Sequence, residues 1–248
     1  MEKPAVLVTG ANGALGRHIC RELAARGERV LAVGRRIDAV RDALLDVEAP
    51  LDTQDPATGG SCRALGFNVT DPAAWQAARA ADDTAGQPWT PLRGAVFAAG
   101  GWRGGRPFHE SEDATWSAMV DMNLETARVG LVALLPLLVA QRGGSIVLLG
   151  SRAAARPWES AGAAAYAAAK AGLVALGAAV AAEVLDHGVR VNTLLPSVID
   201  TPDNRASMPN ADHSRWVAPA SLCDVISFLL SDAARDVSGA ALPVYGRA

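Results

Sequence analysis

The feature that most constrains the fold of this chain is a short apolar segment that runs directly into a glycine-rich turn. Residues 6–8 are Val, Leu and Val, and Gly10, Gly13 and Gly16 follow at intervals of three. Such an apolar run is typical of a strand buried on both faces. The glycines permit a tight turn, a close backbone approach and the packing of a following helix. The free N–H groups of that helix predict a site for the pyrophosphate of a dinucleotide; an ordinary strand, turn and helix is the alternative.

Length and composition fit one folded domain. The chain has 248 residues, of which 50% are hydrophobic and 20% are charged, and its net charge is −3. This composition supports a full core. The basic residues are scattered, so we expect a small-molecule substrate rather than nucleic acid or a membrane surface. The longest apolar run, residues 129–140, is interrupted by Pro136 and is shorter than the roughly 20 residues of a membrane span.

The cysteines indicate a reducing compartment. Cys20, Cys62 and Cys223 are odd in number and far apart in the sequence, which suits buried, reduced thiols better than disulfides or a metal site. No secretory signal is expected, because the glycine turn begins before an apolar signal core could form. We therefore expect a cytoplasmic protein without a metal.

Strand and helix patterns alternate along the chain. This alternation predicts an α/β class fold: one domain over residues 1–248, Rossmann-like and doubly wound, with a seven-stranded, mostly parallel sheet and helices on both faces. Residues 49–60 are expected to form a surface loop, and residues 196–217, which show no periodicity, a substrate lid. Strands are expected at 6–8, 29–33, 62–69, 94–98, 145–150, 190–195 and 240–244, and helices at 14–26, 39–47, 72–81 with Asp71 as cap, 113–142, 163–185 and 219–230.

The tip of the second expected strand bears on the choice of cofactor. In this architecture an acidic residue there binds the ribose 2′-hydroxyl of NAD. The chain has Gly34-Arg35-Arg36 instead. Arg35 suits a 2′-phosphate, so we favour NADP(H) over NAD(H). Two solvated arginines opening a helix are the alternative.

The loop after the fourth expected strand is the next candidate for ligand binding. Ala99 and Gly100 stand at its start and Trp102 is surrounded by glycines. Ligands bind at the carboxyl ends of strands in open α/β sheets. The loop is therefore expected to approach the cofactor, with Trp102 as an aromatic wall for the substrate; a glycine loop with a packing tryptophan is the alternative.

Tyr166 and Lys170 carry the clearest chemical signal. They are four residues apart in an expected helix and so share one face, about 5–6 Å apart at Cβ. A cation at that distance favours the phenolate and lowers the pKa of the phenol by roughly 1–3 units. Tyr166 then exchanges a proton with a carbonyl or alcohol oxygen while a nicotinamide exchanges hydride with the carbon.

The chain resembles the short-chain dehydrogenase/reductase family through motifs in the family's order: Thr9, Gly10, Gly13, Gly16, Ala99, Gly100, Asn123, Ser151, Tyr166 and Lys170. The resemblance implies that Tyr166 is the general acid/base and that Lys170 also bonds the nicotinamide ribose. It implies that Ser151 polarises the substrate oxygen and that Asn123 holds a water in a proton relay. The residues predicted to bind cofactor are Gly10, Asn12, Gly13, Leu15, Gly16, Arg35, Asn68, Val69, Ala99, Gly100, Tyr166, Lys170, Pro196 and Thr201. Those predicted to contact substrate are Trp102, Ser151, Trp158, Tyr166 and Trp216.

Within the family the substrate loop resembles that of dihydropteridine reductases. Three departures limit this likeness: Ser151 where those enzymes have no serine, Gly34-Arg35 in place of an acidic residue, and Ser197 in place of a glycine after Pro196. The matching residues are Ala99-Gly100-Gly101-Trp102, Asp200-Thr201-Pro202, Asn204-Arg205, Ser207-Met208-Pro209, Ala211-Asp212 and Trp216.

The sequence favours an NAD(P)H-dependent oxidoreductase acting on a carbonyl/alcohol pair. The alternatives are a quinonoid dihydropterin reductase, a 3-oxoacyl thioester reductase, and a non-catalytic regulator that senses a dinucleotide. The expected helices at 113–142 and 163–185 carry small and apolar residues around more than one face. Family members resembling this chain pair there, which implies a homodimer or homotetramer; Ala168, Ala171 and Ala175 allow close helix approach.

Overall fold

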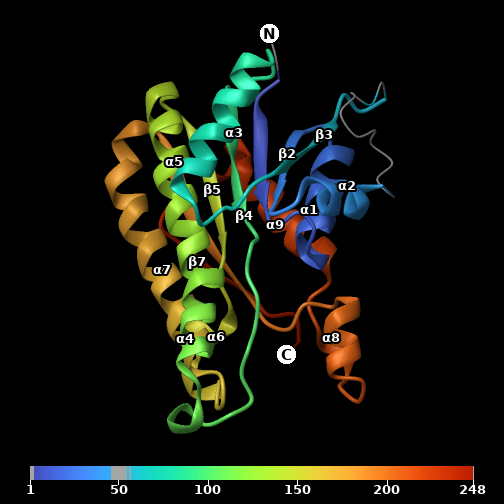
Figure 1. The fold of residues 1–248 in the computed structure, drawn as a ribbon, viewed down its shortest axis with the longest axis vertical. Helices are drawn as coiled ribbons and strands as arrows, with labels where there is room; N and C mark the ends of the chain where they lie inside the picture. Colours follow the sequence, from blue (N-terminus) through green and yellow to red (C-terminus); the bar gives the residue numbers. More distant parts are fainter. Residues whose placement is uncertain (1–2, 46–54, 56, 248) are drawn as a thin grey trace.

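The computed structural model describes residues 3–45, 55 and 57–247, and within them the strands form one sheet (Figure 1). Its order is β3-β2-β1-β4-β5-β6-β7, and every neighbouring pair is parallel. The strands are β1 Ala5–Thr9, β2 Arg29–Gly34, β3 Ser61–Gly66, β4 Leu92–Phe97, β5 Gly144–Leu149, β6 Val189–Pro196 and β7 Ala241–Val244. The expected doubly wound sheet is confirmed, and it is parallel throughout.

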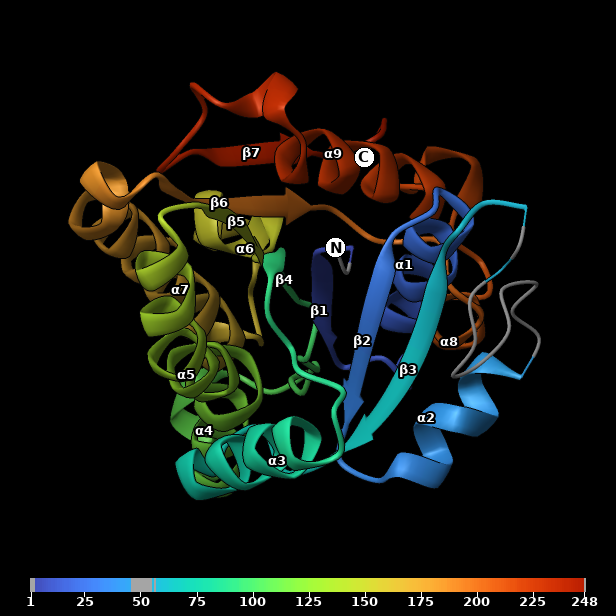
Figure 2. The same ribbon diagram turned by 90° about the horizontal axis from the view of Figure 1, so that it is seen from above.

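Helices cover both faces of the sheet (Figure 2). Those on the face of α1 are α1 Ala14–Ala25, α2 Ile37–Leu44 and α9 Pro219–Leu230. Those on the opposite face are α3 Pro72–Thr84, α5 Thr126–Gln141 and α7 Ala164–Val184. Three shorter helices are α4 Asp113–Val120, α6 Arg152–Ala155 and α8 Pro202–Ser207. The expected loop at 49–60 and the end of the helix expected at 39–47 lie largely outside the described residues.

The core consists of two apolar layers divided by the sheet. In β1, Val6 and Val8 belong to the layer under α1 and α9, whereas Leu7 belongs to the layer under α5 and α7. All five residues of β1 are buried, which confirms the expectation from residues 6–8. Burying each such side chain contributes about 1.5–3 kcal/mol, so β1 stabilises both layers.

The start of α3 shows how local sequence sets an element. Asp71 precedes the helix and its carboxylate accepts a hydrogen bond from the Ala73 amide at 2.9 Å. Pro72 occupies the first turn, where its missing N–H leaves no bond unmade. The predicted cap is therefore confirmed.

The helix expected at 113–142 is interrupted. A π-helical turn at Asp121–Glu125 separates α4 from α5. Two side chains there bond to carbonyls one turn earlier: Asn123 Nδ2 donates to Met119 O at 3.1 Å, and Thr126 Oγ1 donates to Met122 O at 3.0 Å. Turns of this kind occur frequently at functional sites. An apolar pattern averaged over thirty residues does not reveal one inserted residue.

The three cysteines, distant in sequence, lie in one core layer. Cys20 of α1, Cys62 of β3 and Cys223 of α9 are buried and free. A hydrogen bond with Cys62, together with burial, raises the pKa of the Cys20 thiol well above its usual value, and burial raises the pKa of Cys223 to about 12. Little thiolate of Cys20 or Cys223 is present at neutral pH, and the burial of all three indicates packing residues.

Two helical stretches are long and apolar enough to cross a membrane by length and composition alone, Asp113–Gln141 and Ala164–His187. Both lie on the sheet, and their residues Leu134, Leu138 and Leu173 are core residues. A core helix of a globular protein meets the same criteria of length and hydropathy. Packing on the sheet therefore explains the apolar residues on one face of each helix.

The segment expected to be an unstructured lid, residues 196–217, contains regular structure. It holds α8 and a 3₁₀ turn at His213–Arg215. Asp200 and Arg205 form a two-pronged ion pair at 2.5 and 2.8 Å, and Arg215 bonds to the carbonyl of Arg247 at 2.8 Å. Short elements of this length do not produce a readable periodicity, which is why the sequence reads as a loop.

Candidate active site

The site is organised where the strand order reverses. Thr9 at the end of β1 pairs with Val33 of β2 on one side and Phe97 of β4 on the other. The crevice at such a switch point is where open α/β sheets bind ligands. Gly10 has φ +71°, and a Cβ there would lie 2.7 Å from Ala99 Cα, so only glycine lets the two strand ends meet.

The turn from β1 to α1 leaves the helix N-terminus open. Gly13 caps α1 without any side-chain hydrogen bond. A Cβ on Gly16 would lie 2.1 Å from the carbonyl oxygen of Gly10, so the helix begins against the strand. Free N–H groups beside an uncrowded backbone are what a pyrophosphate requires. Leu15, also predicted to bind cofactor, packs half-buried against the core, and Asn12 is exposed.

The tip of β2 is open to solvent. Arg35 and Arg36 are exposed, and among the described residues neither guanidinium has a hydrogen-bond or ion-pair partner. A Cβ on Gly34 would lie 2.5 Å from Val40 Cγ2 and 2.9 Å from Asn12 Oδ1. Packing therefore requires glycine at 34, and Asn12 is brought to the same corner as Arg35.

Asn68 and Val69 follow β3 at the neighbouring edge. Asn68 Oδ1 accepts from the amide of Thr70 at 3.2 Å and from its hydroxyl at 3.0 Å. The carbonyl of Val69 accepts from the indole of Trp75 at 3.0 Å. Their place at the carboxyl ends of the strands is as predicted; a contact with cofactor stays a prediction.

Asn123 ties the π-helical turn to the loop after β4. It is 1% exposed. Its Oδ1 accepts from the Gly101 amide at 3.2 Å, and its Nδ2 donates to Gly101 O at 2.9 Å as well as to Met119. Both amide protons are therefore used inside the protein, and one oxygen lone pair remains for a water. Gly101, which completes this pair, was not among the predicted site residues.

Lys170 lies in the interior beneath the same loop. The residue is 5% exposed; its Nζ donates to Leu149 O at 2.6 Å and lies 5.9 Å from the centre of the Tyr166 ring. A Cβ on Gly100 would lie 3.5 Å from this Nζ and 3.0 Å from Asn123 Oδ1. The fold therefore gathers Asn123 and Lys170 around Gly100, with the Tyr166 ring beside Lys170.

The pKa of Tyr166 departs from the sequence-based expectation. Burial raises the pKa of the phenol, and a hydrogen bond with Ser151 lowers it by less. The expectation that Lys170 lowers this pKa is wrong for the protein without cofactor. The ammonium is directed to the carbonyl of Leu149, and burial lowers the pKa of Lys170 itself to about 8.

Ser151 stands at the carboxyl end of β5, as predicted. It caps α6, and its Oγ accepts from the amide of Ala153 at 3.1 Å. That bond uses a lone pair, so the hydroxyl proton is left to donate. The interaction with Tyr166 places serine and phenol oxygens in one site.

The tryptophans predicted to contact substrate all keep solvent-exposed surface. Trp102 and Trp158 are 61% and 75% exposed, and Trp216 packs on His213 with ring centres 4.3 Å apart. Of the other predicted residues, Pro196 ends β6 and Thr201 caps α8. Contact of these residues with ligands stays a prediction.

The residues present fit a nicotinamide dinucleotide. Three features suit this group. The backbone at Gly10 and Gly16 leaves no room for a Cβ atom, α1 has no side-chain cap, and the buried amine of Lys170 lies near the phenol of Tyr166. Within the described part of the chain, no group of three or more His, Cys, Asp or Glu side chains is arranged for a metal ion.

Comparisons with known proteins agree with this geometry. A family model described as short chain dehydrogenase matches residues 4–212. A 2,5-dichloro-2,5-cyclohexadiene-1,4-diol dehydrogenase of Sphingobium indicum is 29% identical over 97% of this chain and 94% of its own. A short-chain type dehydrogenase/reductase from Mycobacterium ulcerans superposes with a TM-score of 0.86 at 28% identity, over 100% of this chain and 90% of that chain. A 3-oxoacyl-[acyl-carrier protein] reductase from Brucella melitensis with bound NAD gives 0.82 at 26% identity, over 99% and 90%.

Proposed function

Because this chain belongs to the short-chain dehydrogenase family, we propose that it is an NADP(H)-preferring oxidoreductase that interconverts a carbonyl compound and its alcohol, with Tyr166 as general acid/base. The observation that carries the proposal is the gathering of Asn123 and Lys170 beside Gly100, with the Tyr166 ring centre 5.9 Å from Lys170 Nζ and Ser151 interacting with the phenol. Four polar groups in one crevice have no packing purpose that apolar residues would not serve better.

The roles of the side chains follow from their surroundings. A bound nicotinamide supplies the hydride chemistry. The raised pKa of Tyr166 keeps the phenol protonated at neutral pH, so it is ready to donate a proton to a carbonyl oxygen. Ser151 donates a hydrogen bond to that same oxygen as negative charge develops on it. In the oxidative direction the phenol must first lose its proton, so alcohol oxidation is favoured by rising pH.

Arg35 supports the preference for NADP(H). Its guanidinium is exposed at the tip of β2 and free of partners among the described residues, with a glycine where an acidic residue would be needed for NAD. A charge-assisted bond to a 2′-phosphate is the role it fits. The solved reductase from Brucella melitensis has NAD bound, so relatives of this chain include an NAD-binding protein. The preference for NADP(H) over NAD(H) is therefore measured on this chain itself.

The outer faces of α5 and α7 support a homo-oligomer. Val132 on α5 is 62% exposed, and Leu185 just after α7 is 59% exposed. Ala168 and Ala175 are also exposed on α7. In the apolar 18-residue windows within Asp113–Gln141 and Ala164–His187, only 44% and 39% are buried, which leaves a second apolar face on each helix. A second copy packed there makes a homodimer or homotetramer.

A panel of substrates tests the proposal. Simple ketones, quinonoid dihydropterin and 3-oxoacyl thioesters are each mixed with NADPH, and loss of cofactor absorbance is followed. We expect a ketone to be reduced fastest. The name of the Brucella melitensis relative supports oxoacyl thioesters as the second candidate, and the lid residues around Trp216 support quinonoid dihydropterin. Cofactor binding with no turnover on any substrate would instead indicate the non-catalytic regulator.

A further inference from the structure

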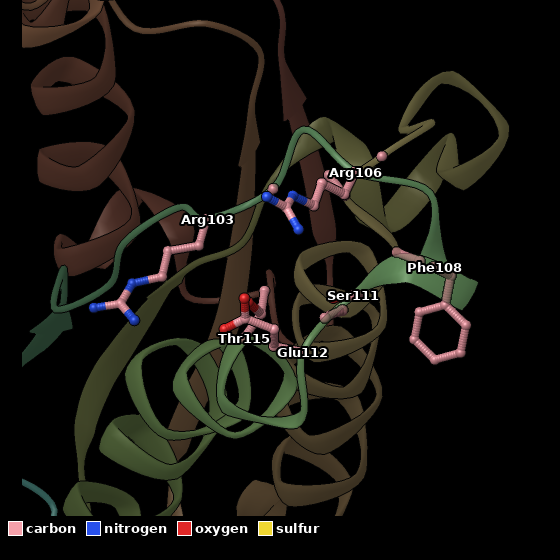
Figure 3. Close-up of a pocket in the computed structure, with 11 residues that line it drawn as sticks. Arg103, Arg106, Phe108, Ser111, Glu112 and Thr115 are labelled. Carbon is pink, nitrogen blue, oxygen red and sulfur yellow. The ribbon is translucent and has the colours of Figure 1, made fainter.

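We propose that a cavity beside the loop after β4 binds an anionic oxygen group, a carboxylate or a phosphate, at the far end of the substrate from its reacting carbonyl. This inference rests on the proposed oxidoreductase function. The cavity has a volume of about 200 Å³, the space of roughly six water molecules. Residues of the loop, of the start of α4 and of the start of α7 line it (Figure 3).

The cavity adjoins the catalytic helix. The amide of Gly105 donates to Gly162 O at 2.8 Å, and a Cβ on Gly104 would lie 2.7 Å from that oxygen. The loop that begins at Gly100 is thus hydrogen-bonded to the residues that precede Tyr166. Ala164 and Ala165 line the cavity, so its wall continues directly into the acid/base residue.

Two arginines without counterions dominate its charge. Arg103 and Arg106 both line the cavity. Within the described residues neither guanidinium has a hydrogen-bond or ion-pair partner. In Figure 3 the side chain of Arg106 points back over the cavity, whereas the ring of Phe108 is turned away from it. Guanidinium groups are suited to pairing with carboxylate and phosphate oxygens.

The start of α7 adds to the positive potential. This helix of 21 residues has no acidic residue in its first turn and no side-chain cap at Ala163. The positive end of its dipole therefore faces the cavity, and no residue of its own first turn compensates it. Together with the two arginines of the lining it gives this cavity a positive potential.

Glu112 is the single carboxylate in the lining. It is the residue that precedes α4, so it complements the dipole of that helix, as Asp113 in the first turn does. No ion pair within 4.0 Å joins it to an arginine of the cavity. Arg103 and Arg106 remain available to an oxyanion from outside.

Binding of matched probe pairs tests the inference without depending on catalysis. Unbranched oxo acids of five to ten carbons with a terminal carboxylate are compared with their methyl esters, and hydroxyacetone phosphate with hydroxyacetone. Dissociation constants are measured by titration calorimetry with saturating NADP⁺, which prevents reduction. We expect at least one anionic probe to bind about tenfold or more tightly than its neutral partner. Whether the oxo acids or the phosphate show the preference identifies the anion.

Substitutions assign the preference to this cavity. Arg103→Gln with Arg106→Gln removes both guanidinium groups, and we expect it to abolish the difference between anion and neutral partner. Arg79→Gln is the matched control: Arg79 is exposed on α3 and far in the chain from the site, and we expect it to leave the difference unchanged. Circular dichroism confirms that each variant is folded.

Two results overturn the inference: no anionic probe binds more tightly than its neutral partner, or the preference survives the double substitution. The proposed function has its own readout, the oxidation of NADPH by the same probes. Absence of turnover on all carbonyl compounds contradicts that function while the calorimetric result still decides the inference.

Discussion

Lys170 carries an ionisable amine into the interior of the molecule. The residue is 5% exposed, it bonds to the carbonyl of Leu149, and burial lowers its pKa to about 8. The fold therefore tolerates a desolvated amine in its interior. A buried amine near a phenol is better explained by chemistry than by stability.

This burial predicts a pH dependence of stability. The pKa of Lys170 is about 8 in the folded protein against 10.5 for the usual amine, so between these values the unfolded chain binds more protons. The free energy of unfolding therefore rises with pH across that window, by up to about 1.4 kcal/mol per pH unit. Urea titrations of cofactor-free protein and of Lys170→Met at pH 7, 8, 9 and 10 measure it. Because other groups titrate as well, the difference between the two proteins is the quantity compared. Parallel profiles would show that the amine keeps its ordinary pKa.

Ser151 distinguishes a ketone site from a quinonoid one. Its hydroxyl proton is free to donate toward the oxygen that Tyr166 serves. Losing one such donor costs about 10²–10³-fold in kcat, or about 2.7–4 kcal/mol. We expect Ser151→Ala to show a loss of that size on its best ketone, with cofactor affinity unchanged. Near-full kcat in this variant, with quinonoid dihydropterin as the best substrate, would favour the alternative suggested by the lid.

At the level of elements, the turn from β2 to α2 sets cofactor choice. Gly34→Asp is a poor test, because a Cβ there would lie 2.5 Å from Val40. Arg35→Gln removes only the charge. We expect it to weaken NADPH binding by about tenfold, since the contact is solvent-exposed, and to leave NADH binding within about twofold. Equal dissociation constants for NADPH and NADH in the unmodified protein, by titration calorimetry, would remove Arg35 from this role.

Elements were predictable in proportion to the strength of their periodicity. Residues 6–8 form part of a strand buried on both faces, and the helix expected at 219–230 has the same bounds in the structure. The turn at Asp121–Glu125 depends on side-chain bonds to carbonyls. α8 is six residues long. Neither feature leaves a periodic signal, so neither could be read from the pattern.

At the level of the whole molecule, the proximity of Tyr166 and Lys170 was predictable and the cavity was not. Tyr166 and Lys170 share a helix, so their separation of four residues in the sequence determines that they lie on one face. Arg103 and Ala163 meet only because the loop bonds to Gly162. The arginines within a glycine-rich loop were the available signal. The three cysteines likewise meet only in the fold.

The exposed apolar faces predict the assembly. Val132 is 62% exposed on α5, so Val132→Arg places a charge where a second copy is expected to pack. We expect the unmodified protein to be a dimer or tetramer at micromolar concentration by light scattering, and Val132→Arg to have the mass of a monomer. Val132→Ala is the control and should stay assembled. An unmodified protein that is monomeric at this concentration contradicts the proposed interface.

We propose that a nicotinamide bound to this molecule transfers hydride to a carbonyl carbon while Tyr166 transfers a proton to the carbonyl oxygen. The most direct test is the turnover of Tyr166→Phe on the best carbonyl substrate from the panel, with the dissociation constant of NADPH measured beside it. Phenylalanine keeps the ring that packs in the site and removes only the hydroxyl. We predict that cofactor affinity changes by less than about threefold while kcat falls by about 10²–10⁴-fold. A variant that retains most of its activity would show that Tyr166 is not the proton donor.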